Sequence, residues 1–552
     1  MSNREEEKFL QKAELTSRRS FVKGAGTALV GAAALGLMGG CAPQGKSGAA
    51  ASSGASAGNV KWDEEYDVIA VGAGAAGMAA AITVATEGEG ATCLLAEKGK
   101  TPNGNTPYAK GTIVYTDNVD AFASYMKEMR GEGSTPDDVL DAYAKGAGEN
   151  FDWVFGLGAT KEEAEIKAPS TVDDPLKNNP EFSEFEHCYA LGTFTVGKAS
   201  KVEIKGAKHI SIFLESVIKD HSDSVTYRTD AAMTELIQDP ATKRIEGAVI
   251  GGKNIKAKKG VIMTCGGFEN DPVMMQNFIG QGAARPAAGV LNTGDGHRAC
   301  MKIGADFWHM EHVAGFWMAG RNLENTSFTN NQIISPCPKA FGFTVGVNGR
   351  RYYMDWDGYS SREKVPYKSD LSLHVGSRHG HMQIGGEWPH LAQPSKAWYV
   401  FDQAGLAAGA IPAESSKDPV ADKLVVTANT IEELAQKMNV PAEELVATTN
   451  QWNECCANGK DIFFHRPTNT LTPVSTPPFY AQICIPAFLN TDGGPVRSAH
   501  GEILDPDGKP IPGLYSAGEF GSIWSGVYQG GGNVAECLIF GRISARSALQ
   551  KA

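Results

Sequence analysis

The clearest pattern in the chain is a pair of apolar runs separated by a helical stretch. Residues 68–71 are apolar, and a glycine-rich turn and then an alanine-rich stretch follow them. A second apolar run ends at Glu97. A short apolar run bounded by glycine is typical of a buried strand, whereas a longer alanine-rich stretch is typical of a helix. Residues 67–97 are therefore predicted to form a complete βαβ unit.

The glycines of this turn have the spacing Gly72-x-Gly74-x-x-Gly77, and Glu97 lies twenty residues beyond the last of them. This spacing is the dinucleotide-binding fingerprint. Gly72 permits a tight turn, Gly74 lets backbone N–H groups approach a pyrophosphate, and Gly77 lets helix and strand pack closely. Glu97 is expected to accept a hydrogen bond from a ribose hydroxyl. The alternative is an ordinary strand-to-helix turn in another kind of α/β protein.

Two further segments indicate which dinucleotide is bound. Gly104-Asn105-Thr106 follows soon after Glu97, and the glycine-rich segments 513–519 and 530–533 lie near the C-terminus. Distant segments that return to one βαβ unit suit a long cofactor that crosses the whole domain. The sequence therefore favours FAD over NAD.

The alternation of strands and helices continues to about residue 303 and then stops. Helical patterns cover 119–158, 206–218 and 293–303, strands are expected at 225–231, 245–250 and 261–268, and a last helix begins near Val534. The intervening region is rich in aromatic residues, with a hairpin signal at 347–350 and one helical region at 430–458. We predict an α/β, Rossmann-like cofactor domain in two parts, 63–305 and 486–552, with an inserted α+β lid, 306–485.

Residues 1–41 have the features of an export signal. The segment Ser17-Arg18-Arg19-Ser20-Phe21 precedes residues 24–40, which carry no charge. This order is typical of a twin-arginine signal, and Met38-Gly-Gly-Cys41 is similar to a lipoprotein cleavage site. We expect export to the outer face of the cytoplasmic membrane or the periplasm, with Cys41 carrying a lipid. The alternatives are a cleaved signal without lipid and a soluble helix. Residues 42–62, rich in Gly, Ala and Ser, are predicted to be a flexible linker.

Composition narrows the classes of partner. The chain has 552 residues, of which 42% are hydrophobic, so two or more folded lobes are expected. A formal charge of -12 argues against nucleic acid binding, because no basic stripe is available to neutralise phosphates. The ten cysteines include no Cys-x-x-Cys, so neither an iron–sulfur cluster, a zinc ribbon nor a covalent haem is expected, and no metal site is predicted.

These motifs together resemble the FAD-dependent fumarate reductase and succinate dehydrogenase flavoprotein superfamily, in its soluble, exported, single-chain branch. Further matching stretches are 264–268, 293–296, 348–352 and 491–494, and the resemblance runs through nearly all of residues 63–548. It implies a set of FAD contacts from both parts of the cofactor domain. These are Gly72, Gly74, Ala75, Ala76, Gly77, Glu97, Asn105, Thr106, Gly266, Asp295, Glu519, Asn533 and Val534.

The resemblance also implies a proton donor. In the superfamily a hydride passes from flavin N5 to one alkene carbon, while an arginine of the lid protonates the other. Arg362 is the matching residue, and Glu363 and Asp355 are candidate helpers that return its proton. Cys337-Pro-Lys-Ala340 stands where the superfamily has a Glu-x-x-Arg relay, which is a departure from the pattern. The alternative for Arg362 is a surface Arg–Glu pair on a loop.

Departures from the superfamily pattern indicate the substrate class. Phe316-Trp317, Leu489 and Gln529 stand where members acting on dicarboxylates have histidines and an arginine. Tyr528-Gln-Gly-Gly-Gly532 is similar to a Tyr-x-Gly-x-Gly segment of 3-ketosteroid dehydrogenases, in which the tyrosine hydroxyl and the later glycine N–H hold a ketone oxygen. Such a pair is an oxyanion hole. The alternative is that Tyr528 merely packs on the flavin.

These resemblances imply an exported flavoenzyme that reduces the carbon–carbon double bond of an α,β-unsaturated carbonyl compound. The expected substrate is neutral and bulky or aromatic, such as a steroid-like enone or a plant phenolic. Electrons are expected from a cytochrome-like carrier outside the cytoplasm, as in anaerobic respiration. Two alternatives remain open, namely the reverse dehydrogenation and a non-catalytic electron shuttle.

Overall fold

The computed structural model describes residues 60–550 with several gaps. The gaps are residues 103, 132, 176, 178–181, 183–184, 197–208, 281–283, 287–288, 322, 324–332, 338–340, 354, 356–395, 412, 414–415, 467 and 526–527. All described residues belong to one compact unit, 55–552.

The first sheet is built around the predicted βαβ unit. Its main strands lie in the order β19 (Glu502–Leu504), β20 (Pro510–Ser516), β9 (Lys253–Met263), β1 (Glu64–Val71), β2 (Cys93–Ala96), β6 (Val225–Arg228), and β7 (Met233–Gln238) and β8 (Ile245–Ile250) join it at β9. Strands β20, β9, β1, β2 and β6 pair with one another in parallel, whereas β19 pairs antiparallel with β20 and β8 pairs antiparallel with β9. The last four residues of β1 are buried, as expected for a strand covered on both faces.

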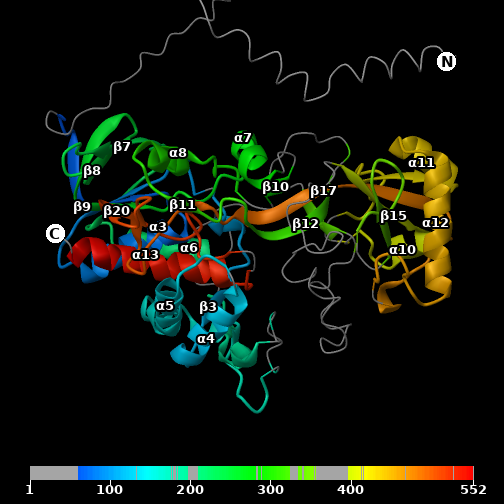
Figure 1. The fold of residues 1–552 in the computed structure, drawn as a ribbon, viewed down its shortest axis with the longest axis horizontal. Helices are drawn as coiled ribbons and strands as arrows, with labels where there is room; N and C mark the ends of the chain where they lie inside the picture. The colour runs from blue at the N-terminus through cyan, green and yellow to red at the C-terminus, as the bar shows by residue number, and fades with distance from the viewer. Residues whose placement is uncertain are drawn as a thin grey trace, which may run out of the picture. The chain divides into compact units, whose positions relative to one another are not determined.

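Helices cover this sheet. Helix α3 (Ala75–Glu87) packs directly on it, α6 (His209–Asp220) packs on α3, and α8 (Asp295–Lys302) packs on β7. Helix α4 (Val119–Arg130) packs on α5 (Asp137–Gly156), α5 packs on the last helix, and this last helix, α13 (Gly532–Gln550), packs directly on the sheet. The first and last of these, α3 and α13, lie side by side (Figure 1), with Gly541 at the contact. A side-chain carbon at Gly541 would lie 2.7 Å from the carbonyl oxygen of Ala76. The C-terminal helix α13 therefore packs closely against the first turn of α3, directly after the glycine turn.

A second, mostly antiparallel sheet is organised around one long strand, β17 (Phe479–Thr491). The other members are β10 (Arg285–Pro286), β12 (Val313–Arg321), β13 (Ile333–Cys337), β14 (Gly342–Val345), β15 (Ala397–Asp402) and β16 (Val425–Ala428). Helices α11 (Ile431–Met438) and α12 (Ala442–Ala457) pack on it through a core that contains Trp452 and Phe343 (Figure 1). The C-terminal end of β17 reaches the first sheet, where the Thr491 hydroxyl accepts from the Phe268 N–H.

A small third sheet stands beside the first. It consists of β3 (Ile113–Tyr115), β5 (Gly192–Phe194) and β4 (Ile166–Lys167), in the order β3-β5-β4. The short helix η2 (Thr106–Tyr108) leads into it. None of the helices in the described part of the chain is long and apolar enough to span a membrane.

The expected fold class is confirmed, and two local predictions are wrong. The single helical region at 430–458 is two helices, because Asn439 adopts a left-handed conformation and Pro441 follows it. The hairpin signal at 347–350 gives only a turn, in which the Gly346 N–H donates to the Arg350 carbonyl oxygen. Strand β14 pairs with β15 instead of with the residues that follow this turn. The domain boundaries at 305 and 485 stay predictions.

Candidate functional site

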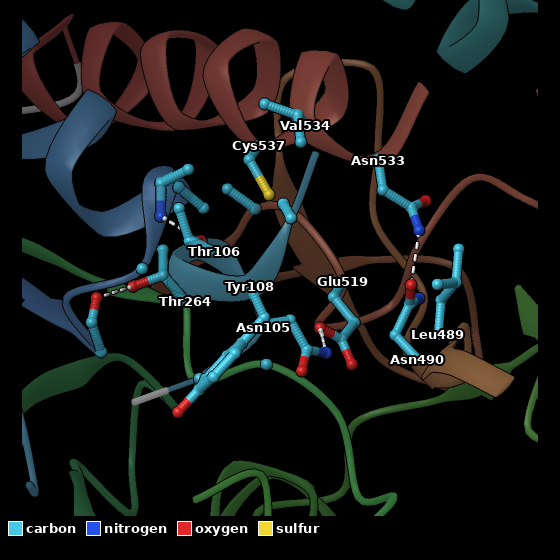
Figure 2. Close-up of a pocket in the computed structure, with 18 of the residues that line it drawn as sticks. Asn105, Thr106, Tyr108, Thr264, Leu489, Asn490, Glu519, Asn533, Val534 and Cys537 are labelled. Atoms are coloured by element: carbon cyan, nitrogen blue, oxygen red, sulfur yellow. Dashed lines mark hydrogen bonds between the residues drawn. The ribbon is translucent and has the colours of Figure 1, made fainter. Parts of the chain in front are cut away.

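A cavity of about 500 Å³ lies where the carboxyl ends of β1, β2, β9 and β20 meet α3 and α13 (Figure 2). Ligands of α/β sheets bind at this edge. With the exception of Gly77, every predicted FAD contact lines the cavity. They are Gly72, Gly74, Ala75, Ala76, Glu97, Asn105, Thr106, Gly266, Asp295, Glu519, Asn533 and Val534.

The glycine turn forms one wall of this cavity. Gly72 has a φ of +107°, and a side-chain carbon there would lie 2.5 Å from the carbonyl oxygen of Thr264. Gly74 is the N-cap of α3 with no side-chain cap, and the N–H of Ala75 donates to the Thr106 hydroxyl over 2.9 Å. The positive end of the α3 dipole therefore faces the cavity, which favours an anion such as a pyrophosphate. Gly77 lies behind the wall, between helix and strand.

The two charged residues at the end of β2 are held by neighbours. The Glu97 carboxylate accepts from the N–H of Ala73 over 3.1 Å and from the N–H of Gly99 over 2.9 Å. Burial raises the pKa of Glu97, and these N–H groups oppose that rise. Each carboxylate oxygen can accept a second hydrogen bond, which leaves capacity for a ribose hydroxyl. Lys98 forms an ion pair of 2.6 Å with Asp295 on α8.

A network of amides and carboxyls follows β9 and β20. The side-chain N–H₂ of Asn105 donates over 2.8 Å both to Glu519 and to Glu269, and that of Asn292 donates to Glu269 over 2.7 Å (Figure 2 shows the bond to Glu519). Burial, and then the neighbouring Glu269 carboxylate, raise the pKa of Glu519 well above its usual range. Asn105 and Glu519 were predicted from the sequence, whereas Glu269 and Asn292 were missed.

At the α13 side, Figure 2 shows Asn533, Leu489 and Asn490 around one part of the cavity. The side-chain N–H₂ of Asn533 donates to the Asn490 side-chain oxygen over 2.6 Å. The side-chain oxygen of Asn533, Oδ1, is buried and has no hydrogen-bond partner within the described structure. A bound cofactor with polar groups offers such an atom a partner.

Tyr528 lines the cavity, but its predicted partner Gly532 does not. The Tyr528 ring packs edge-on against Trp524, with centroids 5.4 Å apart. The N–H of Gly532 donates to the Gln529 carbonyl oxygen over 2.9 Å, so it is directed into the turn. The structure therefore does not bring the two expected donors together in the cavity wall. Gln529 also lines the cavity, and its side-chain oxygen accepts from the Tyr125 hydroxyl.

For four predicted residues of the lid, the structure describes either the backbone alone or nothing. Arg362 and Glu363 lie outside the described residues. Phe316 and Trp317 belong to β12, where they pair with Phe488 and Ala487 of β17, and only their backbone is described.

Asp355 is described, and its surroundings indicate a structural role, while its predicted role as a helper of Arg362 stays a prediction. It is fully buried and pairs with Arg466 over 3.0 Å and with Arg351 over 3.2 Å. Arg351 also pairs with Asp461 over 2.8 Å. These buried ion pairs connect separate segments of the lid, so the described contacts of Asp355 are structural.

Other residues that line the cavity were not among the predicted FAD contacts. Thr264 and Cys265 follow β9, Asn490 lies at the end of β17, and Asn292 precedes α8. The available signal was the rule that ligands contact the carboxyl ends of parallel strands, applied to β9 as well as to β1. No group of three metal-ligating side chains occurs in the part of the chain that the structure covers.

The cavity fits a long dinucleotide. A glycine cradle and a helix N-terminus suit a pyrophosphate, Glu97 suits a ribose, and the buried atoms Glu519 Oε1 and Asn533 Oδ1 lack partners among the described residues. Glu97 and Tyr528 line the same cavity. These features agree with a cofactor that enters at the glycine turn and extends to the α13 side.

Comparison with known proteins agrees with this geometry. A family model described as "FAD binding domain" matches residues 67–534. Digoxin reductase of Eggerthella lenta is 27% identical over 592 aligned positions, covering 96% of this chain and 96% of that protein. Vinyl phenol reductase of Lactiplantibacillus plantarum is 25% identical, covering 88% of this chain and 97% of that protein. The crystal structure of 3-ketosteroid Δ1-dehydrogenase from Sterolibacterium denitrificans has the same fold, with a TM-score of 0.68 at 20% identity, over 89% of this chain and 100% of that one.

Proposed function

The chain belongs to the FAD-dependent fumarate reductase and succinate dehydrogenase flavoprotein superfamily, and on this basis we propose that it reduces the carbon–carbon double bond of a neutral, bulky α,β-unsaturated carbonyl compound. It is a FAD-dependent oxidoreductase acting on CH–CH groups of a small molecule. The observation that carries the proposed substrate class is the cavity wall, where Tyr528 lies with the uncharged residues Leu489 and Gln529.

This wall favours a carbonyl group over a pair of carboxylates. A dicarboxylate must be neutralised when it leaves water, because an unpaired buried charge is costly. Leu489 and Gln529 provide no positive charge for this purpose. The two relatives named above are called reductases of digoxin and of vinyl phenol, and neither name is that of a dicarboxylate.

When bound and reduced by two electrons from the electron donor, the flavin would supply the hydride that adds to the β carbon of the substrate. As this carbon gains the hydride, negative charge develops on the carbonyl oxygen, and the Tyr528 hydroxyl is the proposed donor to that oxygen. One such donor typically lowers the barrier by about 3 kcal/mol. Gly532 becomes a second donor only if its N–H leaves the Gln529 carbonyl oxygen. We assign protonation of the α carbon to Arg362, which lies outside the described residues.

Anaerobic oxidation of reduced viologen by the FAD-loaded protein tests the proposal. We expect turnover with bulky enones, aromatic alkenes or cinnamates, and little with fumarate. Fumarate as the best substrate would overturn the proposed class. Turnover only in the opposite direction, with a saturated ketone and an electron acceptor, would favour the dehydrogenase. A protein that binds FAD but turns over none of these compounds would be an electron shuttle.

We also propose export by the twin-arginine pathway and an electron donor outside the cytoplasm, such as a cytochrome. The support is the Ser17–Phe21 segment and the uncharged stretch after it. Replacing Arg18 and Arg19 by lysine should retain the protein in the cytoplasm, as cell fractionation would show. Cys41→Ala should abolish labelling with a fatty acid analogue without removing export. Unchanged fractionation of the double lysine variant would contradict the pathway.

A further inference from the structure

Two carboxyl groups meet on residues that follow neighbouring strands, and one of them, Glu519, lines the cavity. Glu269 comes after β9 and Glu519 after β20, and one amide group, that of Asn105, donates to both over 2.8 Å. Gly267 leaves the room between them. A side-chain carbon at Gly267 would lie 2.3 Å from Glu269 Oε2 and 2.5 Å from Glu519 Oε1.

The donors around Glu269 fit an ionised carboxylate. Its Oε1 accepts from the side-chain amides of Asn105 and Asn292, and its Oε2 accepts from the Thr491 hydroxyl over 3.1 Å. The Thr491 oxygen itself accepts from the Phe268 N–H, so its proton is directed to Glu269. Burial of this side chain, which is 1% exposed, raises the pKa of Glu269, and the amide donors of Asn292 and Asn105 oppose that rise by stabilising the charged form.

Glu519 has the opposite environment. Glu519 is one of the residues that line the cavity, and it accepts from Asn105 through Oε2. Its Oε1 is buried and has no hydrogen-bond partner in the described residues. Two carboxylates this close, bridged by one neutral amide and removed from water, cannot both be ionised. The proton that the pair retains therefore resides on Glu519, next to the ionised Glu269.

The surrounding charges act in the same direction. Asp492 and Glu536 are buried near the pair, and the thiol of Cys537 adjoins Glu519. The nearby cation, Arg497, lies 3.4 Å from Glu536 and is thereby compensated by it. His297 of α8 is buried against Phe268, and burial lowers its pKa to about 4, so it is neutral above that pH. None of these groups carries an uncompensated positive charge that would stabilise a second negative charge on the carboxyl pair.

We propose that Glu269 is a positioning residue that keeps Glu519 in its neutral acid form, and that tight FAD binding requires this one proton. FAD carries a negatively charged pyrophosphate, so a second carboxylate charge in the same wall would repel it. A neutral Glu519 removes that charge from the cavity wall. The inference rests on FAD binding alone and does not depend on the proposed substrate.

The raised pKa of Glu519 determines how FAD affinity changes with pH. Burial and Glu269 raise the pKa of Glu519 well above its ordinary value of 4.5, so the proton is lost only as pH rises through the raised pKa. FAD affinity should be constant below that pH and fall above it. If the proton is required, the dissociation constant rises by up to about tenfold per pH unit.

Measured dissociation constants of FAD between mildly acidic and alkaline pH test this. The wild type should show the alkaline loss of affinity, and Glu519→Gln should remove the slope while keeping the acid-side affinity within about threefold. Glu269→Gln should begin to lose affinity at lower pH, because the neighbouring charge that holds the proton on Glu519 is gone. Glu454→Gln, an exposed glutamate on α12, is the matched control and should follow the wild type. A flat wild-type profile, an unchanged slope in Glu519→Gln or a wild-type profile in Glu269→Gln would each overturn the proposal.

A second measurement on the unaltered protein covers the case in which these variants fail to fold. Calorimetry of FAD binding in buffers of different ionisation enthalpy reports protons taken up on binding. We expect almost none on the acid side and an uptake that approaches one proton per FAD as pH rises through the range where affinity falls. No uptake at any pH would show that Glu519 does not need its proton.

Discussion

Gly77 and Gly72 are in backbone contact, since a side-chain carbon at Gly77 would lie 1.9 Å from the Gly72 carbonyl oxygen. Gly77→Ala should therefore destabilise the apoprotein by about 2–3 kcal/mol through overpacking. Gly74→Ala is a matched control, because its added carbon meets only the Thr106 hydroxyl, at 3.4 Å. Thermal unfolding of the apoproteins measures the difference.

The same pair of variants separates packing from cofactor contact. Gly74 caps the helix whose N-terminus faces the cavity, so Gly74→Ala should leave unfolding within about 0.5 kcal/mol of the wild type yet weaken FAD binding. Equal stability of both variants would show that α3 can shift away from β1 at no cost.

Tyr528→Phe tests the proposed donor to the carbonyl oxygen. Loss of one oxyanion donor typically lowers kcat about 100-fold or more. We expect a loss of this size in the viologen assay, with FAD binding retained because the ring still packs on Trp524. Tyr115→Phe removes a hydroxyl from another buried tyrosine and should leave the rate within about twofold. Equal rates for both variants would mean that Tyr528 only packs in the wall.

Asp355→Ala separates a structural role from a catalytic one. It leaves Arg466, which is fully buried, without its 3.0 Å partner, so we expect a loss of about 3–5 kcal/mol in the free energy of unfolding. Chemical denaturation measures this loss. The rate of the correctly folded fraction should be close to that of the wild type. A stable Asp355→Ala variant with a greatly reduced rate would support the helper role.

The parts of the fold that sequence reasoning identified are those determined by local pattern. The βαβ unit is formed by residues that are adjacent in the chain. Its glycines Gly72 and Gly77 make the close backbone contacts that their spacing predicts. The break between α11 and α12 also had a local signal, in Asn439 and Pro441, but the amphipathic pattern continues across it. A continuous pattern thus concealed a turn that two residues cause.

The carboxyl pair could not be predicted in this way, because it depends on distant parts of the chain. Asn105 contacts Glu269 and Glu519, which lie 164 and 414 positions away. Glu269 belongs to none of the predicted FAD contacts, and the pairing of β9 with β20 brings it next to Glu519. The predicted pairing of Tyr528 with Gly532 failed for a local reason, although the two residues are close in sequence. Their spacing suggested a shared site, but the local turn directs the Gly532 N–H to Gln529.

His309 gives the fold a defined acid sensitivity. It is 4% exposed, with its Nδ1 2.7 Å from the Ser522 carbonyl oxygen and its Nε2 2.8 Å from the Ser134 hydroxyl. Burial lowers its pKa from 6.5 to about 4. Between these values the unfolded chain binds a proton that the folded one does not, so stability is full above pH 6.5 and is lost as pH falls toward 4. This loss amounts to about 1.4 kcal/mol per pH unit for one histidine.

His309→Asn tests that assignment. Asparagine tolerates the left-handed backbone of this position, where φ is 54°, and it carries no titrating group. The variant should be less stable than the wild type at neutral pH but should lose less stability on acidification, by about 1 kcal/mol or more per pH unit. The measurement is the free energy of unfolding in denaturant at several pH values between 4 and 7. His297, whose pKa burial also lowers to about 4, continues to titrate in the variant, so a residual slope is expected. An acid slope identical to that of the wild type would show that His309 is already charged in the folded protein.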